Sequence, residues 1–420
     1  MHELLPEAQR DFALEVVRKL RSAGYAALWA GGCVRDLLLD RTPKDYDVAT
    51  SAWPKEIRGL FGHRRTLAIG AAYGVITVKG RRGAGQVEVA TFRSDDQYDD
   101  GRRPKSVRFS DARQDAQRRD FTVNGLFFDP IGQEVVDYVG GREDLQRRVI
   151  RAIGDPVQRF GEDKLRLLRA IRFATVLDFA IDPPTLEAVG RMAGQIGVVS
   201  PERITAELQR ILTEPHRSRG VELLLETGLA AEILPELVFQ DRPSREHALA
   251  VLDRLPQATF PCSLAVLFHG QVEPEGGGEI AKRWRMSNRD ADRVVWLLAN
   301  YDALSGARSK RWSALQRILI AEGIEELLAI WEAEARTGSG DAEEAAWCRA
   351  QLARPPAELD PPPLATGDDL IRHGIRPGPA YRRLLEQLRD AQLDGQIVDR
   401  RQALALADQL LQQGPCPEEP

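Results

Sequence analysis

The spacing of apolar residues divides the chain into an N-terminal part of mixed pattern and a longer part of helical pattern. Residues 8–23 carry apolar side chains at helical spacing, and Gly24 follows where such a helix would end. From about residue 162 onward, apolar residues recur at three and four positions, which predicts helices. Between these parts, short apolar runs bounded by glycine, aspartate and arginine predict strands at 26–30, 46–49, 74–78, 87–92 and 125–128.

These patterns predict an α+β chain in which a mixed-sheet head precedes helical segments. A length of 420 residues exceeds what one core supports, so two to four domains are expected. We expect the head at 1–141, a helical neck at 142–215, a helical body at 216–353 and a helical tail at 364–413. The proline-rich stretch at 354–363 predicts a stiff linker before the tail.

Composition excludes several classes of protein. The 58 basic and 63 acidic residues give a net charge of -5, which argues against duplex DNA or an anionic membrane as a bulk partner. The uncharged run at 255–272 contains two prolines and a histidine, so it does not predict a membrane span. The four cysteines form no Cys-x-x-Cys pair and the first residues lack the features of a signal peptide, so we expect a cytoplasmic protein without a disulfide framework or zinc site.

The first candidate for chemistry is Gly31-Gly32-Cys33-Val34-Arg35-Asp36, followed by Asp45-Tyr46-Asp47. Two glycines between a strand and a helix let backbone N–H groups approach a phosphate, and an arginine adds a charged fork. Aspartates two residues apart on a strand share one face, where they can bind hard divalent cations. An aspartate-rich turn would give the same local pattern, and the upstream glycines and arginine favour the metal site.

Two further motifs place arginines next to acidic residues. The first is Arg118-Arg119-Asp120-Phe121-Thr122-Val123-Asn124, where the arginines suit a triphosphate and Asp120 can orient an arginine. The second is the predicted helix at 162–173, on which Asp163, Arg166 and Arg169 share a face. A surface charge run and a solvated ladder of ion pairs are the alternatives. Residues 142–172 hold nine basic and five acidic residues, a local basic patch in an acidic chain.

Together these motifs resemble the bacterial and eukaryotic branch of the CCA-adding tRNA nucleotidyltransferase and poly(A) polymerase family. The resemblance runs through most of the chain and implies a head of the polymerase beta-like nucleotidyltransferase fold. It implies that Asp45 and Asp47 hold catalytic Mg²⁺ and that the incoming nucleotide lies near Gly32, Arg35, Arg119, Asp163, Arg166, Arg169 and Arg172. Glu88, on the strand that resembles the family's next one, is either a third metal ligand or a salt-bridging residue beside Arg93.

In the family, an aspartate and an arginine at the positions of Asp163 and Arg166 bind the edge of the incoming base. A carboxylate accepts a hydrogen bond from the exocyclic amino group that C and A share, and a guanidinium donates to their ring acceptors. U and G present the opposite pattern, so their entry would leave buried polar groups unpaired. The resemblance therefore implies addition of CCA to the tRNA 3′ end from CTP and ATP, without a nucleic-acid template.

Several positions depart from the family pattern. Asp40 replaces a usual glycine, Gly125 replaces a usual alanine, and residues 70–75 differ from the His-Gly-Thr-Val of many CCA-adding members. An enzyme that adds only A, or a poly(A) polymerase, therefore remains an alternative, and an inactive RNA-binding homologue is a remote one. The polar loop at 98–104 resembles CCA-adding and A-adding proteins more than poly(A) polymerases, and it disfavours a CC-only enzyme.

The body contains a segment similar to the metal-dependent phosphohydrolase domain of some family members. Such a domain needs adjacent histidine and aspartate, whereas here Gly270 follows His269. We therefore expect a degenerate helical remnant in which His247 and His269 are ordinary helix residues. The tail is expected to pack or to contact tRNA and to take no part in catalysis.

Overall fold

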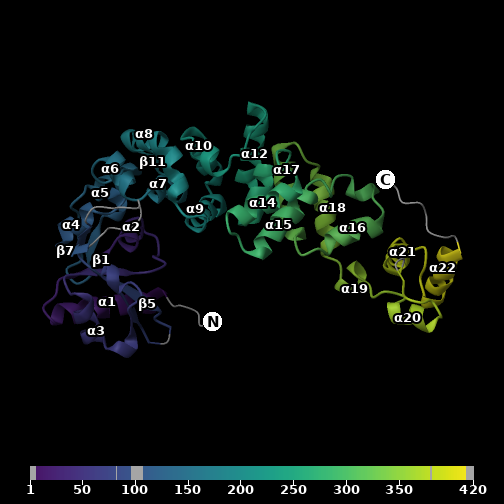
Figure 1. The fold of residues 1–420 in the computed structure, drawn as a ribbon, viewed down its shortest axis with the longest axis horizontal. Coiled ribbons are helices and arrows are strands. Elements are labelled where there is room, and N and C mark those ends of the chain that lie inside the picture. The colour runs from purple at the N-terminus through teal and green to yellow at the C-terminus, as the bar shows by residue number, and fades with distance from the viewer. Residues whose placement is uncertain (1–5, 82, 96–106, 379–380, 413–420) are drawn as a thin grey trace. The chain divides into compact units, whose positions relative to one another are not determined.

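The computed structural model describes residues 6–81, 83–95, 107–378 and 381–412 (Figure 1). The chain forms two compact units, residues 1–237 and 238–420, each considered separately below. The boundary falls inside the predicted body at 216–353, and the finer division into head, neck, body and tail stays a prediction. The predicted loop at 98–104 lies outside the described residues.

The first unit is built on a seven-stranded sheet in the order β3-β4-β5-β2-β1-β8-β9. Parallel pairing occurs only between β2 and β5 among the described strands of this sheet. The register pairs Asp47 at the start of β2 with Ala30 on β1 and with Glu88 on β5. The strands are β1 (Ala27–Ala30), β2 (Asp47–Thr50), β3 (Thr66–Leu67), β4 (Val75–Lys79), β5 (Gln86–Thr91), β8 (Phe127–Asp129) and β9 (Glu134–Val136).

Helices α1 (Pro6–Ser22) and α3 (Pro54–Phe61) pack on this sheet, α1 against β1, β2 and β5 and α3 against β4 and β5. The apolar positions that predicted α1 are buried, as that spacing requires: Phe12, Val16, Val17 and Leu20. Helix α2 (Gly32–Leu38) follows β1 directly and contacts it. The predicted strands at 26–30, 46–49, 74–78 and 87–92 are therefore confirmed within about a residue, whereas 125–128 is half turn and half β8.

Helices make up most of the rest of the first unit: α4 (Ala112–Gln117), α5 (Gly141–Arg147), α6 (Pro156–Glu162), α7 (Leu165–Leu177), α8 (Pro183–Met192), α9 (Pro201–Thr213), α10 (Arg217–Glu226) and α11 (Leu229–Ile233). Helix α7 packs against α9 and α10 through a largely apolar surface. The predicted neck is not purely helical, because β10 (Val149–Ile150) and β11 (Ala180–Ile181) form a short parallel ladder. A second short ladder joins β6 (Arg93–Asp95) to β7 (Val107–Phe109).

The prediction of one helix from residue 162 is wrong. Helix α6 ends at Glu162, α7 begins at Leu165, and Asp163 between them has extended backbone angles of φ -147° and ψ 109°. The Asp163 carboxylate instead accepts a hydrogen bond of 3.0 Å from the Leu165 N–H at the start of α7. An aspartate side chain that binds a backbone N–H competes with helix formation, which accounts for the break.

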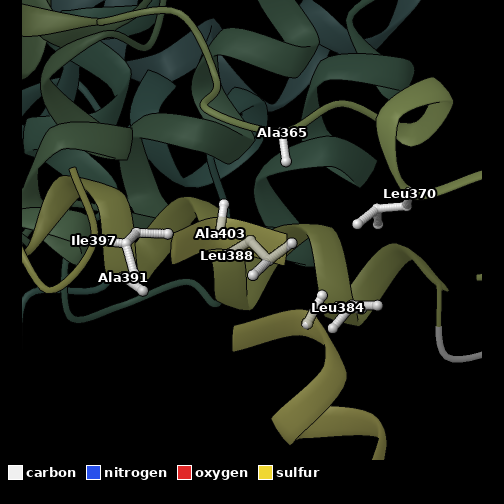
Figure 2. Packing of buried hydrophobic residues seen from close by; sticks show 8 residues of the cluster. Ala365, Leu370, Leu384, Leu388, Ala391, Ile397 and Ala403 are labelled. Carbon is white, nitrogen blue, oxygen red and sulfur yellow. The ribbon is translucent and has the colours of Figure 1, made fainter. Parts of the chain in front are cut away.

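The second unit consists of helices in its described residues. They are α12 (Arg242–Arg254), α13 (Phe260–Phe268), α14 (Pro274–Arg283), α15 (Asn288–Ala299), α16 (Trp312–Leu319), α17 (Ile324–Thr337), α18 (Ala342–Leu352), α19 (Pro356–Leu359), α20 (Gly367–Arg372), α21 (Tyr381–Leu393) and α22 (Arg400–Gln412). The last three share a small core in which Leu370, Leu384 and Leu388 meet Ala403 (Figure 2). The proline-rich stretch before them includes α19, and the Gln316 side chain donates to Leu359 O at 3.0 Å, so this stretch packs on α16.

None of the described helices is both long enough and apolar enough to cross a membrane.

Candidate active site

A cavity of about 900 Å³ in the first unit is lined by residues from each predicted motif. Its wall includes the glycine turn, the aspartate strand, the Arg118–Asn124 segment and helices α7 and α9. The predicted site residues that line it are Gly32, Arg35, Asp45, Asp47, Arg119, Asp163, Arg166, Arg169 and Arg172. Folding thus brings together groups up to 140 residues apart in sequence, while the role of each group stays a prediction.

The two aspartates both line the cavity, although β2 begins at Asp47 and Asp45 lies just before it. Asp45 and Asp47 are open to the cavity, and Tyr46 between them is buried against Trp29 with ring centroids 4.9 Å apart. Beneath them, Cys33 is buried with its Sγ 3.3 Å from Ala30 O, and burial raises the pKa of this thiol to about 12. Cys33 is therefore a packing residue and not a reactive thiolate.

Negative charge accumulates at Asp47. Partial burial on the cavity floor, and then the neighbouring carboxylates of Asp45 and Glu88, raise the pKa of Asp47 to about 7, although Arg119 opposes the shift. Among the described residues, neither Asp45 nor Asp47 has a hydrogen bond or ion pair to its carboxylate. Carboxylates that repel one another without a cationic partner are the donor set that a divalent cation neutralises.

Glu88 lies on β5 directly beside Asp47 in the parallel register, as the strand adjacency predicted. It is exposed and is not among the residues that line the cavity. Within the described part of the chain, no group of three or more histidine, cysteine, aspartate or glutamate side chains is arranged to hold a metal ion. The register therefore gives Glu88 an electrostatic effect on Asp47, and its role as a third ligand stays a prediction.

The glycine turn at Gly31 lies close to the guanidinium group of Arg119. Gly31 has φ +73°, and a Cβ atom there would lie 2.9 Å from Nη1 of Arg119. A side chain at this position would thus meet both backbone strain and the guanidinium. Glycine at 31 lets the turn, α2 and Arg119 share one wall of the cavity.

A buried carboxylate that the motif analysis did not single out holds both arginines of the Arg118-Arg119 pair. Asp115, on α4, accepts from Arg118 through Oδ1 at 2.7 and 2.9 Å and from Arg119 through Oδ2 at 3.0 and 3.2 Å. The two arginines lower the pKa of Asp115 although its burial alone would raise it. Its spacing of three and four residues before them was a usable signal, because those positions meet on a helix.

A second network joins α2 to α7. The Asn124 side chain accepts from Nη1 of Arg35 at 2.8 Å and donates to Asp120 at 3.4 Å. Asp120 in turn accepts from Nε of Arg169 at 2.8 Å. Burial alone would raise the pKa of Asp120, yet Arg169 and then Arg166 lower it to about 2. Asp120 therefore orients an arginine, as the sequence predicted.

Asp163 and Arg166 both face the cavity, although not from one helical face. Nη1 of Arg166 donates to Glu162 at 2.5 Å and to Arg159 O at 2.8 Å. The Asp163 carboxylate pairs with Arg203 from α9 at 2.8 Å. The helical-face prediction is wrong for Asp163 because α7 starts only at Leu165, and the carboxylate reaches the cavity from the segment between the helices.

Arg172 lies deepest among the predicted arginines. It is 5% exposed and pairs at 3.1 Å with Glu207, which is 6% exposed. Burial lowers the pKa of Arg172 to about 10, while Glu207 opposes the shift. Arg203 and Glu207 come from α9 and have no local sequence signal, since only the packing of α7 on α9 brings them to the site.

The structure shows the backbone conformation and packing at Asp40 and Gly125, two positions that depart from the family pattern. Asp40 has φ +53°, a left-handed conformation that favours glycine, so the turn keeps the glycine-type backbone with an aspartate in it. Gly125 packs so tightly that a Cβ atom there would lie 2.6 Å from Cγ2 of Val139. The turn before β2 therefore keeps a backbone that suits glycine, and the small residue at 125 is matched to Val139.

His247 and His269 of the second unit line a cavity of about 280 Å³. His247, on α12, pairs with Glu334 at 2.8 Å, and His269, just after α13, stacks on Tyr301 with centroids 3.6 Å apart. His247 is a helix residue as predicted, whereas His269 ends its helix.

The mixed sheet, the carboxylate pair at the start of its central strand β2 and the surrounding arginines form an arrangement suited to nucleotidyl transfer. Residues 27–151 match the family model described as the poly A polymerase head domain, and residues 178–240 match that of the probable RNA and SrmB-binding site of polymerase A. The chain is 33% identical over 396 residues to the CCA-adding enzyme of Geobacillus stearothermophilus, covering 93% of this chain and 95% of that protein. It is 39% identical to that of Anoxybacillus flavithermus over 66% of this chain and 67% of that one.

Solved structures agree in fold. The crystal structure of the Bacillus stearothermophilus CCA-adding enzyme in complex with CTP aligns with a TM-score of 0.76 and 28% identity, covering 97% of this chain and 98% of that one. The Thermotoga maritima CCA-adding enzyme complexed with tRNA aligns with a TM-score of 0.70 at 20% identity over 97% of each chain. The chain therefore belongs to the CCA-adding enzyme family. Nucleotidyltransferases of this family generally use divalent metals.

Proposed function

We propose that this protein adds C, C and A to the 3′ end of tRNA, using CTP and ATP without a nucleic-acid template. One observation carries the proposal: in a chain 33% identical to a CCA-adding enzyme over 95% of that enzyme, the Asp45–Asp47 pair and the Asp163–Arg166 pair line one cavity. The first pair suits the transfer step and the second suits the choice of base.

The proposed metal is Mg²⁺ at Asp45 and Asp47. The residues fit, because both carboxylates line one cavity without a hydrogen bond or ion pair from any described residue, and the pKa of Asp47 is raised to about 7 by burial and by its acidic neighbours. When bound, Mg²⁺ supplies positive charge that favours loss of the proton from the attacking hydroxyl and balances charge on the leaving pyrophosphate. Glu88 beside Asp47 adds negative charge that strengthens cation binding.

The chain's own residues position the reactants. Arg35 and Arg119 hold the triphosphate, with their guanidinium groups oriented by Asp36 at 2.7 Å and by Asp115 at 3.0 Å. The terminal 3′-oxygen of the tRNA forms a bond to the α-phosphorus, the α–β phosphoanhydride bond breaks, and pyrophosphate leaves with its electron pair. Gly32 starts α2 at this wall and leaves room for the phosphates.

The choice of base follows from donor and acceptor patterns. Asp163 accepts from the amino group of C or A, and Arg166 donates to the ring nitrogen beside it. Arg166 is preset by its contacts to Glu162 and Arg159 O, and Arg169 and Arg172 support the pocket through Asp120 and Glu207. U and G would place a carbonyl against the carboxylate and are rejected because buried groups would remain unpaired.

The test uses three tRNA transcripts that end before CCA, after C and after CC. Each is incubated with Mg²⁺ and CTP, ATP or both, and product length is determined on a sequencing gel. Growth of all three to CCA followed by arrest is the expected result. Extension of only the CC-ended transcript by one A would instead indicate an A-adding enzyme, unlimited A addition a poly(A) polymerase, and no extension an inactive RNA-binding homologue.

A further inference from the structure

The Arg203 side chain forms an ion pair with Asp163, whose carboxylate is proposed to select the base. Its Nη2 lies 2.8 Å from Oδ2 of Asp163 and its Nη1 lies 3.3 Å from Oδ1. The two side chains are 24% and 17% exposed, and both line the cavity. Arg203 is on the first turn of α9 (Pro201–Thr213), so this contact joins α9 to the segment between α6 and α7.

Asp163 needs such a partner because no helix fixes it. Its backbone is extended, and the described contacts of its carboxylate are the Leu165 N–H at 3.0 Å and the two nitrogens of Arg203. The Leu165 contact holds only Oδ1, which leaves rotation of the carboxylate free. The guanidinium fork fixes both oxygens in one plane, which a single point charge does not do.

Counting acceptor sites shows what remains for a base. A carboxylate has about four lone-pair sites. Oδ1 uses two of them, on Leu165 N and Nη1 of Arg203, and Oδ2 uses one, on Nη2 of Arg203. One site on Oδ2 is left among the described contacts, which matches the single amino N–H that C or A would offer.

We propose that Arg203 is a positioning residue that sets the choice of nucleotide by holding the Asp163 carboxylate in the orientation that accepts the amino group of C or A. This inference rests on the proposed function. Arg203 acts through Asp163, because its guanidinium group is already paired with that carboxylate. Without the two hydrogen bonds from Arg203, the Asp163 carboxylate rotates. The site then binds a base with an amino group only slightly better than a base with a carbonyl at the same position.

The test measures kcat and KM of the full-length protein for CTP and for UTP on a tRNA ending before CCA, and for ATP and GTP on a tRNA ending in CC. In Arg203→Gln, the CTP-to-UTP ratio of kcat/KM should fall at least about tenfold, mainly through a higher KM for CTP. Arg203→Lys, which keeps the charge without the fork, should give an intermediate ratio. Arg191→Gln on the exposed face of α8 removes the same charge away from the cavity and should keep the wild-type ratio.

A merely structural role would lower the melting temperature and kcat for all four nucleotides while the ratio stays within about twofold of wild type, and that result would overturn the proposal. If Arg203→Gln does not fold, the ratio for Arg203→Lys decides by the same threshold. The Asp163→Asn variant completes the test, because adding Arg203→Gln to it should change the ratio no further. Failure of the wild type to extend tRNA would refute the proposed function, whereas wild-type extension with an unchanged variant ratio would refute only the role of Arg203.

Discussion

The cavities of the two units both gather titratable groups, yet they differ in how charge is balanced. In the second unit, the two oxygens of Glu334 are taken by His247 at 2.8 Å and by the Tyr301 hydroxyl at 2.8 Å. In the first unit, the carboxylates of Asp45 and Asp47 have no described partner, and the pKa of Asp47 rises to about 7 through burial and acidic neighbours.

The difference shows that carboxylates without a partner, more than the mere presence of titratable residues, indicate a ligand-binding site. Histidine and glutamate that satisfy one another need no ion, and their network stabilises the helices that carry them. The carboxylates of Asp45 and Asp47 in the first unit repel each other. The arginines around them already form ion pairs with other aspartates. A cation and a triphosphate would together complete the balance of charge.

The largest expected effect comes from removing one carboxylate of the unmatched pair. Asp47→Asn should lower nucleotide transfer at least about a thousandfold, because a single carboxylate cannot hold the metal charge at the reacting phosphate. Retained tRNA binding in a filter assay would show that the loss is chemical. The control variant in the other cavity, His247→Gln, should leave the transfer rate unchanged. Loss of transfer in this variant would contradict the view that only the first cavity serves catalysis.

The buried pair between Asp120 and Arg169 should matter for stability. Asp120→Asn leaves the Arg169 charge without its partner and should cost about 3 kcal/mol of unfolding free energy. Glu246→Gln, in the exposed Arg242–Glu246 pair of the second unit, should cost less than about 0.5 kcal/mol. Urea unfolding followed by circular dichroism measures both, and equal costs would contradict the assigned importance of burial.

The same aspartate predicts an acid dependence. Because the folded pKa of Asp120 is about 2 and its unfolded value is near 3.9, its contribution is complete above about pH 4 and is lost as pH falls toward 2. Between about pH 4 and pH 2, the stability of the wild type should therefore decline more than the stability of Asp120→Asn. Parallel declines of the two proteins in urea titrations would show that Asp120 is not the titrating group.

Metal binding should appear as a change in thermal stability. Without metal, the raised pKa of Asp47 means that the folded state holds a proton that the unfolded state releases, so stability should fall as pH rises from about 4 to 7. Adding Mg²⁺ at a hundredfold excess over its dissociation constant should restore up to about 2.7 kcal/mol at pH 8. Differential scanning calorimetry should show a Mg²⁺-dependent rise for the wild type and none for Asp47→Asn.

The smallest expected effect tests the turn that contains Asp40, before β2. Asp40 is exposed and has φ +53°, so Asp40→Gly should stabilise the protein by about 0.5–1 kcal/mol without altering transfer. Asp36→Gly, by contrast, would remove the 2.7 Å contact to Arg35 and is not a neutral comparison. A loss of stability in Asp40→Gly would show that the aspartate side chain, and not the backbone, holds the turn.

Local sequence predicted the elements whose partners are near in the chain. The apolar spacing at 8–23 and the short runs at 26–30 and 87–92 give α1, β1 and β5 because period alone decides which face is buried. The spacing of Asp45 and Asp47 predicted two carboxylates on one face of a strand; both line the cavity, but only Asp47 belongs to β2. Asp115 could have been found in the same way, from its helical spacing to Arg118 and Arg119.

Long-range packing decided the rest. The apolar pattern around residue 162 gives no sign that the helix breaks at Asp163, since the break depends on the carboxylate binding Leu165 N and Arg203. Arg203 and Glu207 reach the cavity only because α9 packs on α7. Short strands such as β10 and β11 have two residues each, too few for a period to be recognised.

The measurement that most directly tests the assignment of one cavity to both nucleotides is single-turnover addition by Asp163→Ala. CMP addition is measured on a tRNA ending before CCA and AMP addition on a tRNA ending in CC, under otherwise equal conditions. If one pocket selects both bases, the two rates should fall by the same factor, about a hundredfold, within threefold of each other. Loss of CMP addition with wild-type AMP addition would contradict the assignment and require a second base-selecting site.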